Sequence, residues 1–197
     1  MTDSAARLNG ETYFFRDQGQ IDLLRLRLLP ELIQARGAGK TLRLCSAGCA
    51  SGEEAYSLAM LIDLILPERE GWRVFILGVD LNPEALEKAR RGRYGAWSFR
   101  LVPEALRQRY FRRDGDGWLL EERIRRMVSF ARVDLVGEAL AQVDLRDMDL
   151  ILCRNVFIYY GAEEVAAVAG KLADALGEGG YLITGHNELV ARNVDRK

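Results

Sequence analysis

Five short apolar segments alternate with amphipathic segments along this chain, and no other feature limits its fold as strongly. Each is five to eight residues long and apolar almost throughout, which is typical of strands that helices cover on both faces. The 197 residues are enough for one domain with a buried core. The expected strands are Thr41–Ala47, Arg73–Asp80, Met127–Arg132, Asp149–Cys153 and Gly180–Gly185.

The segments between these strands carry apolar residues at every third or fourth position, as amphipathic helices do. Pro30 interrupts the first of these patterns, whereas Asn82 suits an N-cap with Pro83 at the first helical position. Strands that alternate with helices predict an α/β fold with a mostly parallel sheet and helices on both faces. The expected helices are Ile21–Gln34, Glu53–Leu66, Pro83–Arg91 and Ala162–Leu176.

The segment Gly92–Arg126 departs from this alternation and is rich in arginine. Its sequence Asp114-Gly-Asp-Gly117 favours a type I′ turn between antiparallel strands, and Trp118–Ile124 has the composition of one of those strands. We therefore expect a small inserted hairpin-like element in this segment.

Composition excludes several classes of protein. Lysine and arginine total 28 against 29 acidic residues, a net charge of −1, which argues against a nucleic-acid-binding protein. The longest apolar stretch, Ala55–Leu66, contains Asp63 and falls short of the roughly 20 residues that a membrane span needs, so we expect no membrane insertion. Three cysteines and one histidine predict no metal centre, and the odd number of cysteines favours a reducing compartment.

Gly48 and Gly52 follow the first expected strand and precede a helix. Glycine lets the backbone approach a ligand closely, and a helix N-terminus presents free N–H groups to an anionic ligand. The spacing is neither that of a dinucleotide fingerprint nor that of a P-loop. The competing interpretation is a tight strand-to-helix connection in which Ser51, Glu53 and Glu54 cap the helix.

Polar residues also follow the second and fourth expected strands. Asp80 ends the second strand, where an acidic side chain can accept hydrogen bonds from a ribose diol. Arg154, Asn155 and Tyr159 follow the fourth strand. Because the carboxyl ends of parallel strands meet at one edge of the sheet, these side chains should face a common crevice, although an Arg-Asn pair alone would also suit a surface turn.

Five motifs occur in one order: TYFFRD, SAGCASGEEAYSLA, GVDLNPEALEKARRGRY, CRNVFIYY and GYLITGHNE. Together, from Gly10 to Glu188, they resemble the chemotaxis protein methyltransferase (CheR-type) family. The resemblance implies a Rossmann-like class I methyltransferase fold over residues 1–197, with an N-terminal cofactor-contacting segment and helix in residues 1–40 and an inserted β-subdomain in residues 92–126. It also implies a cytoplasmic enzyme that transfers the methyl group of S-adenosylmethionine to glutamate side chains of chemoreceptors and releases S-adenosylhomocysteine.

The resemblance further implies roles for individual residues. Thr12 and Arg16 would lie beside the sulfonium and the methionine end of the cofactor, and Glu54 would bind its amino group. Asp80 would take the ribose hydroxyls, and Arg16 and Tyr159 would be the catalytic residues that orient the acceptor carboxylate. The implied cofactor residues are Thr12, Arg16, Glu54, Asp80, Asp134, Leu135, Arg154 and Asn155, of which Asp134 and Leu135 would flank the adenine.

The chemistry that the resemblance implies makes modest demands on the protein. A glutamate carboxylate is already ionised at neutral pH, so methyl transfer needs alignment and no general base. His186, the single histidine, is therefore expected to hydrogen-bond at a strand end. The arginines of residues 92–126 indicate a solvated face or, as the resemblance implies, a contact with an acidic surface of the cytoplasmic helical region of a chemoreceptor.

The chain departs from the family pattern at Gly10 and Asp134, where asparagine is common, and both changes are expected to weaken cofactor binding. Many family members also have an N-terminal helical domain and a further strand after the last motif. Here about ten residues precede the first motif and nine follow Glu188, so we expect a domain of a longer parent chain with additional domains. The alternative functions are a catalytically weak or inactive S-adenosylmethionine-binding module of a larger signalling protein, and a methyltransferase of nucleic acids or small molecules.

Overall fold

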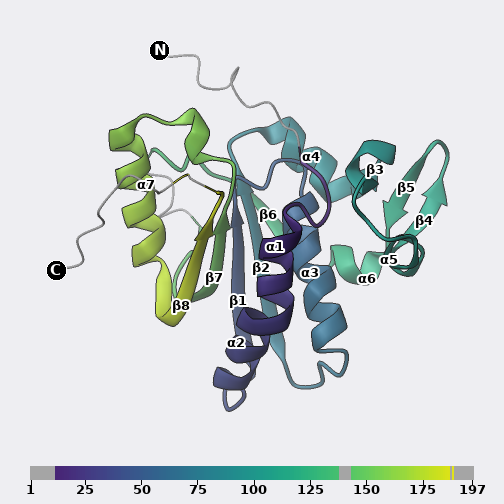
Figure 1. The fold of residues 1–197 in the computed structure, drawn as a ribbon, viewed down its shortest axis with the longest axis horizontal. Coiled ribbons are helices and arrows are strands. Elements are labelled where there is room, and N and C mark those ends of the chain that lie inside the picture. The colour runs from purple at the N-terminus through teal and green to yellow at the C-terminus, as the bar shows by residue number, and fades with distance from the viewer. Residues whose placement is uncertain (1–11, 138–142, 187, 189–197) are drawn as a thin grey trace.

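A parallel sheet organises the fold in a computed structural model that describes residues 12–137, 143–186 and 188 (Figure 1). Its strands are β1 (Thr41–Ala47), β2 (Arg73–Asp80), β6 (Val128–Arg132), β7 (Met148–Cys153) and β8 (Leu176–Thr184). Their order is β6-β2-β1-β7-β8, and every adjacent pair runs parallel. Because β1 lies between β2 and β7, the direction of the connections reverses at that point. This is the mostly parallel sheet that the sequence pattern predicts, in the Rossmann-like arrangement that the family resemblance implies.

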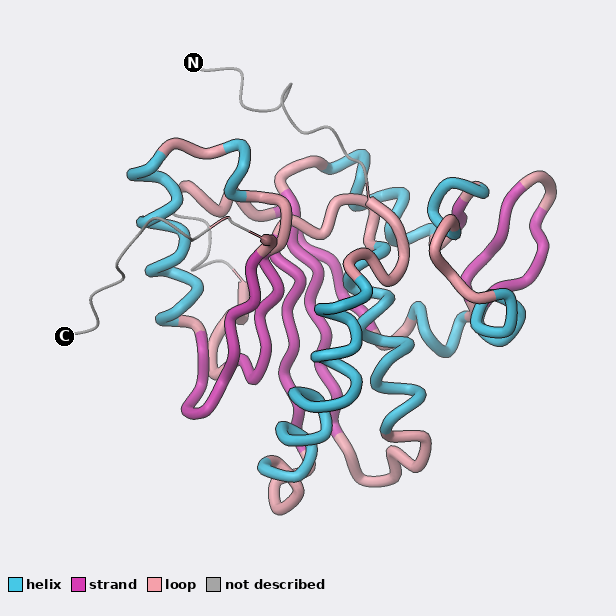
Figure 2. Tube along the Cα trace, in the orientation of Figure 1, coloured by secondary structure: helices cyan, strands magenta, loops and turns pink. Residues whose placement is uncertain are grey.

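The strands are apolar throughout because both faces of the sheet are buried. Leu44 packs in a core cluster with α3 (Glu53–Ile65), whereas the next residue, Cys45, packs in a second cluster with α7 (Ala162–Asp174). Successive side chains of a strand point to opposite faces, so each neighbour in β1 serves a different layer. Figure 2 shows the helices on either side of the strands.

The first predicted helix is divided into three parts around Pro30. It consists of α1 (Gln18–Leu23), a π-helical turn (Leu24–Leu28) and α2 (Leu29–Ala35). The Leu29 N–H donates to the Leu24 carbonyl five residues earlier. In a regular α-helix, proline cannot donate its hydrogen bond and its ring collides with the carbonyl four residues earlier. The wider π turn immediately before Pro30 is a local deformation of the kind that proline causes in a helix.

The boundary between α7 and β8 differs from the prediction. The helix ends at Asp174, and β8 begins at Leu176, before the predicted start at Gly180. Leu176 pairs with Met148, and the register then shifts before Leu150 pairs with Tyr181. The glycines in this irregular stretch interrupt the apolar pattern, so the pattern does not indicate where the strand begins. Among the described residues, the helices are too short or too polar to cross a membrane.

The segment after α4 (Pro83–Arg91) forms a small antiparallel sheet that lies beside the main sheet in Figure 1. Its strand order is β3-β5-β4, and two short helical segments separate β3 from β4. The elements are β3 (Arg93–Tyr94), a 3₁₀ turn (Ala96–Phe99), α5 (Glu104–Tyr110), β4 (Phe111–Asp114), β5 (Gly117–Leu120) and α6 (Glu122–Arg125).

Two details of this sheet correct the prediction. Of the two central turn residues, only Gly115 has a positive φ, of 58°, so the turn is not type I′, which requires a positive φ at both. The strand predicted to run to Ile124 ends at Leu120, and α6 follows it. Leu120 and Ile124 are both buried and lie four residues apart, a spacing that suits a helical turn as well as a strand.

Asp63 of α3 anchors this inserted sheet to the main domain. Its carboxylate accepts hydrogen bonds from Arg123 Nη1 at 2.6 Å and from the Tyr110 hydroxyl at 3.0 Å. Arg69 Nη2 lies 3.2 Å away and Arg109 Nη2 lies 3.6 Å away. Burial and the Asp63 carboxylate raise the pKa of Tyr110 to about 12, so this hydroxyl stays a donor over the physiological range.

Candidate functional site

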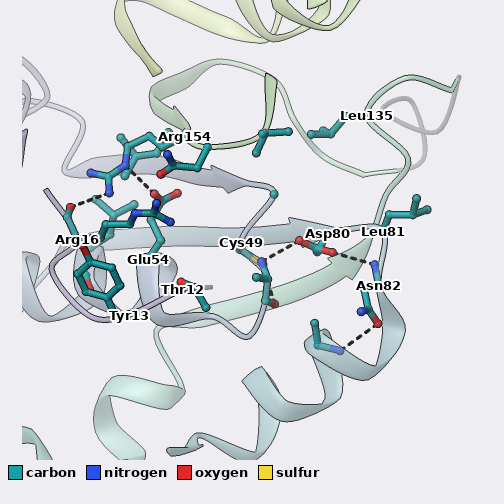
Figure 3. Close-up of a pocket in the computed structure, with 18 of the residues that line it drawn as sticks. Thr12, Tyr13, Arg16, Cys49, Glu54, Asp80, Leu81, Asn82, Leu135 and Arg154 are labelled. Carbon is teal, nitrogen blue, oxygen red and sulfur yellow. Dashed lines mark hydrogen bonds and ion pairs between the residues drawn. The ribbon is translucent and has the colours of Figure 1, made fainter. Parts of the chain in front are cut away.

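A cavity of about 410 Å³ lies at the carboxyl ends of β1, β2 and β7, where the strand order reverses (Figure 3). Open parallel sheets bind ligands at this topological switch point. The N-terminal segment before α1 closes one side of the cavity. All the site residues that the sequence predicts line it except Asp134, namely Thr12, Arg16, Glu54, Asp80, Leu135, Arg154, Asn155 and Tyr159.

The turn between β1 and α3 depends on its glycines. Gly48 and Gly52 have φ values of 77° and 90°, in the left-handed region that favours glycine. A Cβ atom on Gly48 would lie 2.3 Å from Cγ2 of Val156, and one on Gly52 would lie 2.8 Å from Cβ of Ala89. The two glycines therefore allow the turn to pack closely while its backbone borders the cavity.

The two acidic residues at the start of α3 face different parts of the molecule. Glu53 is buried and accepts hydrogen bonds from Ser51 Oγ and Ser98 Oγ, at 2.8 and 2.9 Å. Glu54 faces the cavity, where Ser46 Oγ donates to its Oε1 at 2.7 Å. Glu53 thus joins the turn to the inserted segment, and only Glu54 borders the cavity.

Glu54 has a largely buried carboxylate, with its side chain 16% exposed, and an arginine holds it. Nε of Arg154 lies 2.9 Å from its Oε2. Burial raises the pKa of Glu54 above its ordinary value, and the charge of Arg154 and the hydrogen bond from Ser46 oppose that shift. The site therefore contains an anionic oxygen pair that is partly neutralised before any ligand arrives.

Asp80 connects the two turns that border the cavity. Its Oδ2 accepts the backbone N–H of Ala50 at 2.8 Å, and its Oδ1 accepts that of Asn82 at 2.8 Å. Each carboxylate oxygen has a further lone pair for a ligand hydroxyl. Asn82 caps α4 as predicted, because its Oδ1 accepts from the N–H groups of Glu84 and Ala85 at 2.9 and 3.3 Å.

The N-terminal segment is fixed by its two phenylalanines. Phe14 and Phe15 are buried, and their N–H groups donate to the Ser98 carbonyl and to Ser57 Oγ, at 3.0 and 2.9 Å. This leaves Thr12 and Arg16 to line the cavity, where Figure 3 shows them beside Tyr13.

The turn after β7 supplies three of the predicted cavity residues. The side chain of Arg154 is 3% exposed, and its Nη2 donates to the Arg16 carbonyl at 2.7 Å. Its Nη1 is buried and has no hydrogen-bond partner among the described residues. Asn155 has a φ of 59°, and Tyr159 follows in a 3₁₀ turn (Phe157–Tyr159).

Asp134 lies beside the cavity without lining it. Its Oδ1 accepts the N–H groups of Val136 and Gly137 at 3.0 and 3.2 Å, which closes a turn after β6. Leu135 presents its side chain to the cavity. The predicted weakening of cofactor binding at Asp134 stays a prediction, and Gly10 lies outside the described residues.

His186 also lies outside the cavity lining. Its Nε2 is 2.7 Å from Oδ2 of Asp17, the residue that caps α1. This side-chain contact at the end of β8 agrees with the expected hydrogen-bonding role.

Several cavity residues were not predicted. Tyr13, Cys49, Ile158 and Tyr160 line the cavity, and each belongs to one of the five motifs. Burial raises the pKa of the Cys49 thiol well above its ordinary value and that of Tyr160 to about 12. Both side chains therefore stay neutral and offer contact surface. Their positions inside the motifs are the sequence signal that could have identified them as cavity residues.

The charges around the cavity suit a zwitterionic amino acid joined to a nucleoside. Glu54 could accept hydrogen bonds from an ammonium group, and Asp80 from vicinal hydroxyls. The buried Nη1 of Arg154 could donate to a carboxylate, which would satisfy an atom that has no hydrogen-bond partner within residues 12–137, 143–186 and 188. Among the residues that the structure describes, no three histidine, cysteine or acidic side chains are grouped as a metal site requires.

Comparisons with known proteins point to the same class of ligand. Residues 10–197 match the family model described as "CheR methyltransferase, SAM binding domain". The chain is 39% identical over 191 residues to chemotaxis protein methyltransferase 1 of Pseudomonas aeruginosa, covering 94% of this chain and 68% of that protein. It is 32% identical over 186 residues to a chemotaxis protein methyltransferase of Borreliella burgdorferi, covering 92% and 65%. This chain thus spans about two thirds of the length of these relatives.

Among solved structures, magnesium protoporphyrin IX methyltransferase of Synechocystis PCC 6803 with bound S-adenosylmethionine is 18% identical, with a TM-score of 0.39. That comparison covers 88% of this chain and 65% of the other. The family match and the curated relatives carry the assignment: the chain belongs to the CheR methyltransferase family, a family of S-adenosylmethionine-dependent methyltransferases, and contains its S-adenosylmethionine-binding domain.

Proposed function

We propose that this chain transfers the methyl group of S-adenosylmethionine to glutamate side chains of chemoreceptors in the cytoplasm. Membership of the CheR family supports this function, and so do relatives named as chemotaxis protein methyltransferases. The observation that carries it is the combination of Glu54, Asp80 and Nη1 of Arg154, which has no hydrogen-bond partner among the described residues, around one cavity. These groups match the ammonium, hydroxyl and carboxylate groups of this cofactor.

Three contacts would hold the cofactor. Asp80 would accept hydrogen bonds from the ribose hydroxyls while it keeps its bonds to Ala50 and Asn82. Glu54 would accept from the amino group, and Arg154 would donate to the carboxylate. Leu135 would give an apolar contact to the adenine, with Asp134 holding its turn.

Catalysis would depend on alignment. Bound S-adenosylmethionine supplies an electrophilic methyl group to the attacking carboxylate. An acceptor glutamate is ionised at neutral pH, so no residue of the chain has to remove a proton. Arg16 and Tyr159 line the same cavity and could orient that carboxylate by hydrogen bonds. An arginine can donate two parallel hydrogen bonds, which fixes the direction of the attacking oxygen.

The inserted sheet offers a surface for an acidic partner. Arg112 and Arg113 are exposed on β4, which is an edge strand of that sheet. Arg113 lies over the Trp118 ring, with its guanidinium carbon 4.2 Å from the ring centroid. A basic, aromatic surface of this kind would steer and retain an acidic helical region of a chemoreceptor.

Calorimetry tests the cofactor part of this proposal. We expect micromolar binding of S-adenosylmethionine and S-adenosylhomocysteine by the full chain, and loss of that binding in Asp80→Ala. Asp116→Ala is a matched control, because the Asp116 side chain is 96% exposed and lies outside the cavity. If the full chain binds neither molecule, the cofactor assignment is wrong.

Methyl transfer tests the catalytic part. We expect the chain to transfer radiolabelled methyl groups to a cytoplasmic chemoreceptor fragment, and alkali to release them as methanol, as it does from esters. Arg16→Gln and Tyr159→Phe should slow this transfer at saturating cofactor, whereas Arg25→Gln, on the exposed part of the first helix, should not. Tight cofactor binding without transfer would favour the alternative, a binding module of a larger signalling protein.

A further inference from the structure

Glu188, the last residue of the GHNE motif, joins the ends of two neighbouring strands. Its Oε2 accepts the backbone N–H of Gly185 at 2.6 Å and that of Asn155 at 3.1 Å. Gly185 directly follows β8, and Asn155 lies two residues after the end of β7. One carboxylate oxygen therefore fixes both chain segments at the edge of the sheet that carries the cavity.

The Asn155 turn has an uncommon backbone conformation. A φ of 59° lies in the left-handed region, which few residues with a side chain adopt and which asparagine adopts more readily than most. The turn also sets the position of Arg154, whose guanidinium contacts Glu54 and the Arg16 carbonyl. A change in the turn would move two cavity residues together.

Close packing indicates that the carboxylate is built into this position. A Cβ atom on Gly185 would lie 2.5 Å from Oε2 of Glu188 and 3.1 Å from the Asn155 nitrogen. Oε1 of Glu188 is buried and has no hydrogen-bond partner among the described residues. Among the described residues, the hydrogen bonds of this carboxylate are therefore all made by Oε2, which bonds to the two strand ends.

We propose that Glu188 is a positioning residue for the cofactor cavity. It does not line the cavity. Through the Asn155 N–H it holds the turn that presents Arg154 and Asn155, and through the Gly185 N–H it ties that turn to β8. The proposal rests on the proposed function in that S-adenosylmethionine is taken to occupy the cavity.

Binding of S-adenosylhomocysteine by the full chain and its variants tests this role. We expect Glu188→Ala to weaken binding about tenfold or more, because a lost charge-assisted hydrogen bond has effects of that size. Glu188→Gln should stay within about threefold, since its amide oxygen can still accept both N–H groups. Glu178→Ala is the matched control, because Glu178 is an exposed acid on β8.

A second variant guards against misfolding of Glu188→Ala. Gly185→Ala keeps the carboxylate but displaces it, so it should weaken S-adenosylhomocysteine binding in the same direction. Unchanged binding by a folded Glu188→Ala, or equal losses in Glu188→Gln and Glu188→Ala, would overturn the positioning role.

Amide hydrogen exchange by NMR tests the contact without any ligand. The Asn155 and Gly185 amides should exchange slowly in the full chain and in Glu188→Gln, and at least about tenfold faster in Glu188→Ala. Unchanged protection would show that Glu188 does not hold these strand ends. If the full chain does not bind S-adenosylhomocysteine, the cofactor assignment fails, whereas exchange at these two amides still decides whether Glu188 holds the turn.

Discussion

Nε of Arg154 lies 2.9 Å from Oε2 of Glu54, and the two side chains are only 3% and 16% exposed. The arginine is anchored from a second side by the Arg16 carbonyl, and the glutamate by Ser46. Removing one partner of such a pair leaves a buried charge without compensation, which costs more than the pair contributes. The two charges that we assign to opposite ends of a zwitterionic ligand thus hold each other in place.

The raised pKa of Glu54 predicts that cofactor binding depends on pH. Burial raises the pKa of this carboxyl above its ordinary value. As pH falls through the raised pKa, the carboxyl becomes neutral and loses its attraction for an ammonium group. As pH is lowered, affinity for S-adenosylhomocysteine should therefore start to fall at a higher pH than it would if Glu54 had the ordinary pKa of an exposed carboxyl group. Glu54→Gln should bind weakly and without this pH dependence. Calorimetry from pH 5 to pH 8 measures both, and superimposable profiles would contradict the assignment.

The same raised pKa affects stability with a definite sign. The folded chain binds the Glu54 proton more tightly than the unfolded chain does. The contribution of Glu54 to the free energy of unfolding therefore increases as pH falls from the raised pKa to its ordinary value. Subtracting the urea unfolding profile of Glu54→Gln from that of the full chain isolates this contribution. A difference that rises with pH over this window would contradict the direction of the shift.

Asp80→Asn should affect both stability and binding. Both carboxylate oxygens of Asp80 accept backbone N–H groups, so an amide would bring its own NH₂ against the Ala50 or Asn82 donor. An unpaired buried donor costs about 1–3 kcal/mol, and we expect a loss of that size in urea unfolding. Affinity for S-adenosylhomocysteine should fall at least about tenfold, as expected for a lost hydrogen bond to a charged group. Asp116→Asn should change unfolding by less than about 0.5 kcal/mol.

Substitutions of Asp63 and Tyr110 should lower stability without changing cofactor binding. Asp63→Ala would leave Arg123, Arg109 and Arg69 without their shared carboxylate. Because these arginines are partly exposed and can turn to water, we expect a loss of about 2 kcal/mol in urea unfolding. Tyr110→Phe, which removes one donor, should cost about 1 kcal/mol. Neither residue lines the cavity, so S-adenosylhomocysteine affinity measured by calorimetry should stay the same. A matching loss of affinity would show that the inserted sheet shapes the cavity.

The sequence predicts the central sheet well because burial on both faces leaves an unmistakable apolar signal. That signal fails at Leu176, where glycines interrupt the start of β8, and at Ile124, where one apolar spacing suits two structures. The contacts of Asp63 could not be predicted, since its partners lie up to 60 residues away and arginine spacing carries no information on pairing.

The site shows the same division. Residue types at strand ends place Asp80 and Arg154 at one edge, and the structure brings them to one cavity. The sequence does not reveal which acid of the Glu53–Glu54 pair faces that cavity without the family resemblance, because either could face inward. It also does not reveal that Asp134 closes its own turn, although an acid three residues before Gly137 is typical of such turns.

Gly48 and Val156 offer a test of packing between the turn after β1 and the turn after β7, which both border the cavity. Gly48→Ala would hold alanine at a φ of 77°, which costs about 1–2 kcal/mol, and would place its Cβ 2.3 Å from Cγ2 of Val156. Val156→Ala removes that methyl group and should relieve the collision while leaving the backbone cost. The double variant should therefore unfold at a higher urea concentration than the sum of the two single losses predicts. A double-mutant cycle measures this coupling, and strictly additive losses would show that the two turns do not pack against each other as described.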